Sequence, residues 1–131
     1  MADTCEIFDK RAYNTYPFIV LQKDIYNCNL GGELKILVHL YERTNLFGDK
    51  TPFLLSGYSI IFKLYDVYGN LITNSTANIN NMENSEILTT IDPLFIKKSG
   101  TYYGYFTFAN NQESFTLPTP NDRTRIKIQY K

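Results

Sequence analysis

The chain has 131 residues, with 13 Lys and Arg against 13 Asp and Glu, so its formal net charge at pH 7 is zero. This length fits one domain, and the balanced charge gives no electrostatic attraction to nucleic acid or to anionic lipid. Hydrophobic residues make up 44% of the sequence and aromatic residues 15%, which excludes a disordered chain and allows a substantial core.

Residues 1–16 show neither strand alternation nor a helical stripe, and we interpret them as an N-terminal arm on a domain that covers 17–131. The arm contains Phe8, Tyr13 and Tyr16, although disordered linkers are normally poor in aromatic residues. One interpretation is that these side chains anchor the arm on a partner protein. The other is that the arm adds an edge strand to its own domain.

The chain start lacks a basic region followed by an apolar one, and no apolar run approaches membrane-spanning length. These features predict neither a secretory signal nor membrane insertion.

The segment 34–41 gives the clearest strand signal. Its even-numbered residues are all aliphatic, whereas its odd-numbered residues include Lys35 and His39, so apolar residues recur at a period of two. A long polar loop is expected over 42–52. Alternation, or enrichment in β-branched and aromatic residues, predicts further strands at 18–21, 58–66, 71–79, 87–91, 101–108, 115–117 and 125–130. Short strands separated by turn residues, without crossover helices, predict an all-β, immunoglobulin-like antiparallel β-sandwich of about seven strands.

Residues that could perform catalysis or hold a metal are sparse. His39 is the single histidine, and no Cys or His lies at a spacing typical of metal ligands. The sequence also lacks a Gly-rich phosphate loop and a nucleophile elbow. We therefore expect no enzymatic activity, no catalytic residue, no metal and no cofactor. Cys5 and Cys28 are interpreted as free thiols, because two cysteines do not make a disulfide framework.

Three tyrosines occur close together in the strand predicted at 101–108. Tyr103 and Tyr105 share the outward phase of this strand, and Tyr102 has the inward phase. Outward tyrosines combine apolar area with a hydroxyl group and are typical of partner-binding surfaces. Cross-strand packing within the sheet accounts for the same residues equally well.

A resemblance is carried by Lys98-Ser99-Gly100-Thr101-Tyr102, which is similar to the corner that precedes strand F in immunoglobulin-type domains. The resemblance implies that Tyr102 is the corner tyrosine, whose hydroxyl bonds back to the chain. Two residues further on, where antibody domains have a cysteine, this chain has Gly104. The resemblance is therefore to the broader sandwich class without the inter-sheet disulfide.

A narrower resemblance covers roughly residues 17–131. Residues 53–66, the following Gly69-Asn70 turn and the later Ser99-Gly100-Thr101-Tyr102 segment are similar to the immunoglobulin-like N-terminal domain of phage baseplate upper proteins. The resemblance implies a bacteriophage virion structural protein, made in the host cytoplasm and then incorporated into the virion. Its partners would be other virion proteins of the capsid or tail, and a free-standing domain of this kind would also suit a capsid auxiliary or decoration protein. The alternative is a carbohydrate-binding module that attaches to a cell-surface glycan.

Overall fold

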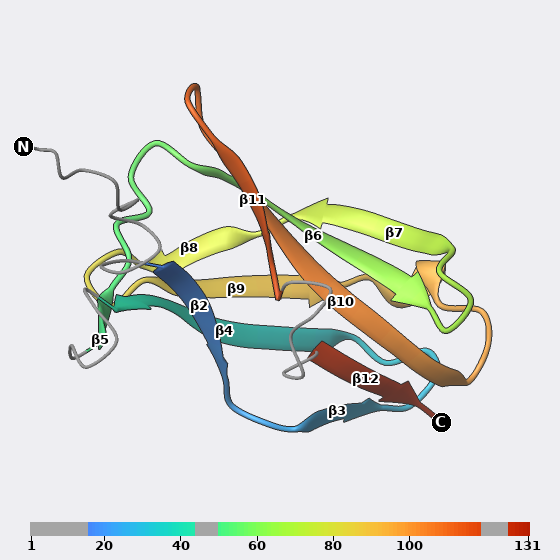
Figure 1. The fold of residues 1–131 in the computed structure, drawn as a ribbon. Coiled ribbons are helices and arrows are strands. Elements are labelled where there is room, and N and C mark those ends of the chain that lie inside the picture. Colours follow the sequence, from blue (N-terminus) through green and yellow to red (C-terminus); the bar gives the residue numbers. More distant parts are fainter. Residues whose placement is uncertain (1–15, 44–49, 119–125) are drawn as a thin grey trace, which may run out of the picture.

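The computed structural model describes residues 16–43, 50–118 and 126–131, which form two β-sheets packed face to face (Figure 1). The first sheet has the strand order β2-β4-β9-β8, and β5 pairs with β4. Its strands are β2 (Tyr16–Leu21), β4 (Leu34–Arg43), β5 (Lys50–Pro52), β8 (Asn78–Asn81) and β9 (Glu86–Ile91).

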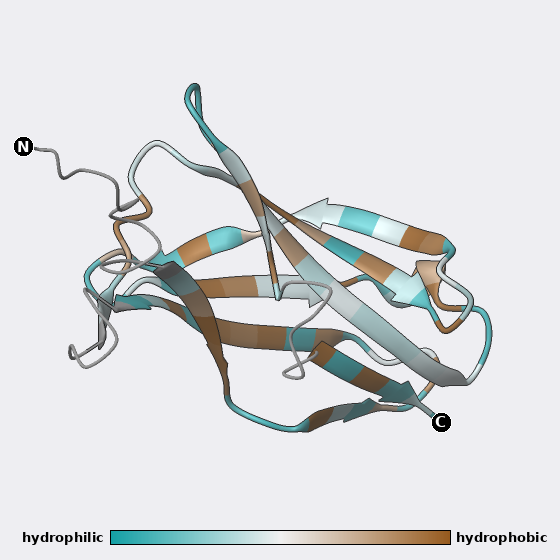
Figure 2. Cartoon of the chain, in the orientation of Figure 1, coloured by the Kyte–Doolittle hydropathy of each residue, from teal (hydrophilic) through white to brown (hydrophobic). Residues whose placement is uncertain are grey.

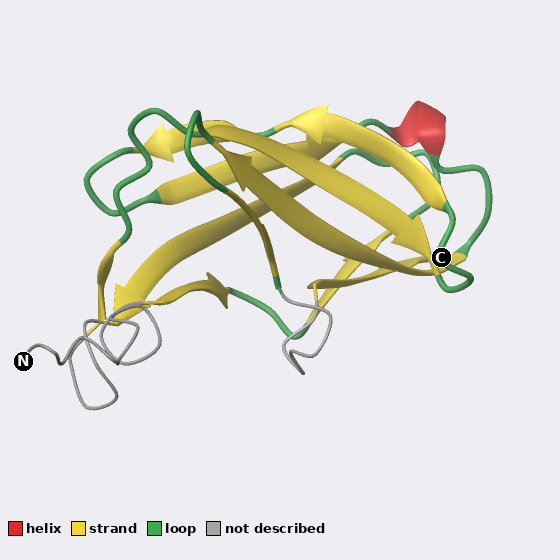
Figure 3. Cartoon of the chain, turned by 45° about the horizontal axis from the view of Figure 1, so that its top comes forward, coloured by secondary structure: helices red, strands yellow, loops and turns green. Residues whose placement is uncertain are grey.

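The second sheet has the order β3-β12-β10-β6-β7, and β11 pairs with β10. Its strands are β3 (Ile25–Cys28), β6 (Ser59–Asp66), β7 (Leu71–Thr76), β10 (Gly100–Ala109), β11 (Ser114–Leu117) and β12 (Ile126–Tyr130). A short 3₁₀ turn, η1 (Pro93–Phe95), follows β9 and lies at one end of the sandwich, where Figure 3 shows it in red.

The connectivity is that of an immunoglobulin-like sandwich, which confirms the predicted fold class. Strands β2, β4, β9 and β8 correspond to A, B, E and D of that fold, and β12, β10 and β6 correspond to G, F and C. Strand β7 adds to the edge beside β6, as the C′ strand does in variable-type domains. The chain passes from β2 in the first sheet to β3 in the second, and β3 pairs in parallel with β12.

Three details differ from the sequence prediction. The β3–β12 pair is parallel, so the sandwich is not purely antiparallel. The expected polar loop at 42–52 is shorter, because β4 continues to Arg43 and β5 pairs with it from Lys50 to Pro52. Tyr16 belongs to the domain rather than to the arm, since it is the first residue of β2 and its backbone pairs with Arg43.

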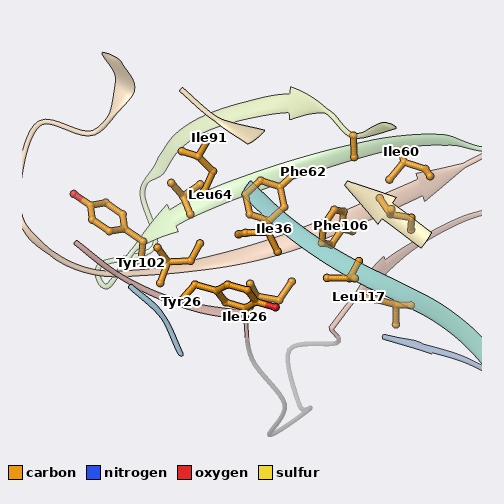
Figure 4. Packing of buried hydrophobic residues seen from close by; sticks show 14 of the residues in the cluster. Tyr26, Ile36, Ile60, Phe62, Leu64, Ile91, Tyr102, Phe106, Leu117 and Ile126 are labelled. Atoms are coloured by element: carbon orange, nitrogen blue, oxygen red, sulfur yellow. The ribbon is translucent and has the colours of Figure 1, made fainter. Parts of the chain in front are cut away.

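The core consists of the inward residues of both sheets, and the hydropathy of β6 and β12 alternates visibly along each strand (Figure 2). Strict alternation in β6, β9, β10 and β12 places every second side chain in this core. Strand alternation in the sequence predicts a core, and all of its members are buried except Leu34, which is half-buried against the cluster: Leu34, Ile36, Val38, Leu40, Ile60, Phe62, Leu64 and Phe106. Figure 4 shows Phe62, Phe106, Ile36 and Ile126 meeting between the sheets.

Gly104 lies beneath the ring of Phe62 in the middle of this core. A Cβ atom at position 104 would lie 2.4 Å from Phe62 Cζ, and Phe62 is fully buried. The same ring packs on Phe106, with 5.0 Å between ring centroids. The aromatic ring of Phe62 therefore occupies space beside the position at which antibody domains carry the strand-F cysteine.

Cys28 is a free thiol of intermediate burial, as expected, whereas Cys5 lies outside the described residues.

This contact gives a first prediction. Gly104→Ala should lower the free energy of unfolding by about 1–3 kcal/mol, because the added methyl group overpacks the core. In a Phe62→Leu background the same change should cost much less, since the shorter side chain leaves room for the methyl group. Urea unfolding of the wild type, both single variants and the double variant measures the coupling. An equal cost of Gly104→Ala in both backgrounds would contradict the contact.

Tyr102 forms the tyrosine corner that the resemblance implies. Its hydroxyl donates a hydrogen bond of 2.7 Å to the carbonyl oxygen of Lys98, four residues earlier. Tyr102 is buried and its ring packs edge-on against Tyr130, with 5.5 Å between ring centroids. Burial, and then the nearby charge of Asp66, raise the pKa of the Tyr102 hydroxyl, which therefore remains a donor at neutral pH.

Tyr102→Phe should lower the free energy of unfolding by about 1 kcal/mol, because the Lys98 carbonyl loses its donor. The matched control is Tyr105→Phe on the same strand, where the hydroxyl makes no side-chain hydrogen bond among the described residues. This control should leave stability unchanged within error. Equal effects in thermal unfolding would mean that the corner bond contributes nothing.

Candidate functional site

The outer face of the second sheet carries a group of tyrosines at its centre. Tyr103 and Tyr105 lie on β10, and Tyr65 lies on the neighbouring strand β6, directly opposite Tyr103. The rings of Tyr65 and Tyr105 are 5.7 Å apart and nearly perpendicular, at 74°. All three side chains are half-buried. The predicted outward orientation of Tyr103 and Tyr105 is therefore confirmed, and so is cross-strand packing for Tyr105.

Two lysines flank these rings. Lys63 is opposite Tyr105, and Lys127 of β12 is opposite Tyr103. The other outward positions in the described part of this sheet are uncharged, and the set contains no carboxylate. These positions are Ile25, Asn27, Ser59, Ile61, Leu71, Asn74, Thr76, Thr101, Thr107, Ala109, Ser114, Thr116 and Gln129. We call Tyr65, Tyr103 and Tyr105, with Lys63 and Lys127, the tyrosine face.

The remaining predicted partner-binding residues are not part of this face. Phe8 and Tyr13 lie outside the described residues. Tyr16 begins β2 at the edge of the first sheet, so the structure does not group it with Tyr103 and Tyr105. Tyr65 was not predicted as a partner-binding residue, because its position beside Tyr103 depends on the β6–β10 register.

His39 is on the outer face of the first sheet, as its phase in β4 predicts. Its Nε2 atom lies 3.0 Å from Oε2 of Glu86 on β9. The sequence could not identify Glu86 as the partner of His39, since the two residues are brought together only by strand pairing.

The described residues bring no three His, Cys, Asp or Glu side chains together at a potential metal site. None of the helical segments among them has the length and apolarity needed to cross a membrane.

The turn between β6 and β7 forms one wall of a second feature, a cleft at the end of the sandwich. Asp66 holds this turn, because its Oδ1 atom accepts the N–H groups of Tyr68 and Asn70, each at 2.9 Å. The opposite wall is the segment from Phe95 to Tyr102. Sequence analysis identified the turn but not the cleft, because its two walls are more than twenty residues apart in the chain.

The Asp66 turn makes acid stability testable. Its hydrogen bonds, above all that from the backbone of Asn70, lower the pKa of the Asp66 carboxyl below its usual 3.8. Because the pKa of Asp66 is lower in the folded state, its carboxylate stabilises the fold at any pH above the usual pKa of the group. This stabilisation is lost as the pH falls through the lowered pKa. Asp66→Asn should therefore make the loss of thermal stability below about pH 4 less steep.

The control is Asp24→Asn, which removes one exposed carboxylate without altering this turn. Melting temperatures measured against pH should show the wild type and the control falling together. If the melting temperature of Asp66→Asn falls as steeply with decreasing pH as that of the wild type, the Asp66 turn is not the source of the acid sensitivity.

No protein-family model matches the chain, and no curated protein is significantly similar to it. Among solved structures, a family 123 glycoside hydrolase from Clostridium perfringens, described in a study of glycolipid glycan hydrolysis, is similar with 14% sequence identity and a TM-score of 0.45. That match covers 90% of this chain but only 27% of the hydrolase chain. At this identity and TM-score the likeness says nothing about the activity of the present chain.

Proposed function

We propose that this chain is a non-enzymatic structural protein of a bacteriophage virion, which docks onto other virion proteins through the tyrosine face. Its place would be that of a capsid auxiliary or decoration protein, or of a tail-baseplate component. The observation that carries the proposal is the composition of the tyrosine face, where three clustered tyrosines and two lysines lie on a sheet surface without an outward carboxylate among the described positions. The resemblance to phage baseplate upper proteins supplies the virion context.

Tyrosine rings suit such an interface because each offers a large apolar area and a polar tip with few rotatable bonds. Tyr65 and Tyr105 already restrain each other, so docking costs less side-chain entropy than ordering mobile residues would. The two lysines favour a partner surface that is neutral or acidic, since a basic surface would be repelled. The proposed partner is therefore another virion protein with an apolar or acidic patch.

The alternative is a carbohydrate-binding module, favoured by the outward-facing, half-buried tyrosine rings. Sugars stack on flat aromatic surfaces, and coplanar rings make the broadest platform. Tyr65 and Tyr105 are instead inclined by 74°, so one ring presents its edge beside the face of the other. This arrangement favours docking of a protein. A glycan array separates the two functions directly.

The test is incorporation into particles. Quantitative mass spectrometry of purified virions should detect the wild-type protein in a fixed number of copies. The Tyr103→Ala, Tyr105→Ala double variant should be incorporated at least about tenfold less, because tyrosines at the centre of an interface each contribute about 1–2 kcal/mol. The control, Lys35→Ala with Thr90→Ala, alters the outer face of the first sheet and should be incorporated normally.

Melting temperatures of the isolated proteins accompany this measurement, and Lys63→Glu with Lys127→Glu provides a second variant that leaves the tyrosine packing in place. Absence of the wild-type protein from particles would overturn the virion assignment. Normal incorporation of both face variants would overturn the assignment of the tyrosine face. Selective binding on the glycan array, with no incorporation, would establish the alternative.

A further inference from the structure

Exposed apolar side chains gather at the end of the sandwich that contains the β6–β7 turn and η1. Ten large hydrophobic residues are exposed in the described part of the chain, and five of them lie in the β6–β7 turn, at the first position of β7 or in η1. We call these five the apolar rim: Val67, Tyr68, Leu71, Leu94 and Phe95. Such a concentration at one end is typical of an interaction surface rather than of scattered surface residues.

Hydrogen bonds in both segments hold the rim outward. The N–H of Asp66 donates to the carbonyl of Asn70 and the N–H of Gly69 to that of Asp66, which fixes the turn carrying Val67 and Tyr68. On the other side, Oδ1 of Asp92 accepts the N–H of Leu94, which caps η1. Buried Ile96 then anchors the chain directly after Phe95. The local backbone therefore fixes this exposure, and the rim is preorganised for binding.

The rim borders a cleft of about 600 Å³, the end cleft, which lies between the turn and the segment from Phe95 to Tyr102. Val67, Tyr68 and Phe95 line it, together with Lys97 and Lys98. Tyr102 forms part of its wall, and the corner bond to the Lys98 carbonyl keeps the lysine-bearing segment in place. Its volume is in the range of clefts that hold a ligand or a peptide side chain.

The accessible charge of the end cleft is positive. Asp66 is the only carboxylate in its lining, and both of its oxygens accept hydrogen bonds from within the turn. Asp92, beside the rim, is engaged in capping η1. Lys97 and Lys98 are exposed, and within the described part of the chain neither ammonium group makes an ion pair. A ligand that fits this site carries a negative charge next to an apolar group.

We propose that the end cleft binds a linear segment of a partner protein in which a large apolar side chain stands beside an acidic residue. The apolar side chain would enter between Tyr68 and Phe95, and the carboxylate would meet Lys97 and Lys98. A protein segment fits better than an anionic sugar, because three of the five rim residues, Val67, Leu71 and Leu94, are aliphatic and favour an apolar side chain over a hydroxylated ring, although Tyr68 and Phe95 are aromatic. The end cleft adjoins the tyrosine face, because Leu71 of the rim is paired with Tyr65, but its lining includes none of the three tyrosines of that face.

The experiment selects binders of the isolated full chain from a yeast-displayed library of random linear peptides. We expect a consensus that pairs a large apolar residue with Asp or Glu. A synthetic peptide of that consensus should shift the amide NMR signals of residues 66–72 and 94–102. Lys97→Glu with Lys98→Glu should weaken its binding about tenfold at low ionic strength, and Phe95→Ser should weaken it to a similar extent.

Leu94→Ser and Leu54→Ser form a matched pair, because both leucines are 71% exposed and only Leu94 belongs to the rim. Leu94→Ser should weaken binding, and Leu54→Ser should not. Lys23→Glu with Lys35→Glu repeats the charge change elsewhere and should leave binding nearly unchanged. Since no particle is needed, the outcome is independent of the proposed virion function.

The proposal is overturned if the selected peptides lack the acidic–apolar pair, or if they bind the cleft variants as well as the wild type. It is equally overturned if their NMR shifts map to Lys63, Tyr105 and Lys127 and leave residues 66–72 and 94–102 unaffected, or if an anionic polysaccharide binds the cleft and no peptide does.

Discussion

The packing of Phe62 over Gly104, on adjacent strands of the second sheet, is the constraint around which the core of the sandwich is built. The ring fills the centre of the core, and it can do so because the neighbouring strand, β10, carries no side chain at position 104. Antibody domains use a disulfide and a strand-C tryptophan in this region, whereas here one phenylalanine and one glycine meet on adjacent strands. Dispersion and apolar burial therefore take the place of a covalent bond, and Phe106 and Ile126 complete the packing around the ring.

Much of the fold could be predicted from the sequence, because period-two alternation records which side chains face the core. The alternation in 34–41 and 58–66 correctly placed Ile36, Val38, Phe62 and Leu64 in the interior. The parallel β3–β12 pair could not be predicted in this way. Pairing between distant segments depends on which strand ends meet, and Ile25–Cys28 is short and mostly exposed outside Tyr26. Strand β5 was missed for the same reason, since Lys50–Pro52 is too short and polar to show a period.

The candidate surfaces were predictable only in part. The outward phase of Tyr103 and Tyr105 follows from their own strand, but the position of Tyr65 beside them is a property of the register. The end cleft is a harder case, because Val67-Tyr68 and Leu94-Phe95 come together only when β6, β9 and β10 are in place. A local signal did exist. Large apolar residues directly follow Asp66 and Asp92-Pro93, in positions where turns normally carry polar residues.

The passage of the chain from β2 in the first sheet to β3 in the second has a mechanical consequence. Residues 22–24 carry the chain from β2 in one sheet to β3 in the other, and β3 then runs parallel to the last strand, β12. Additional backbone bonds from Leu30 to Lys131 and from Lys131 to Cys28 extend this pairing to the end of the chain. A force that pulls Lys131 away from the start of β3 acts along these strands. It loads the bonds of the ladder together, in shear, whereas an antiparallel pair pulled from adjacent ends would open one bond at a time. We therefore expect the parallel β3–β12 pair to resist stretching between these two strands.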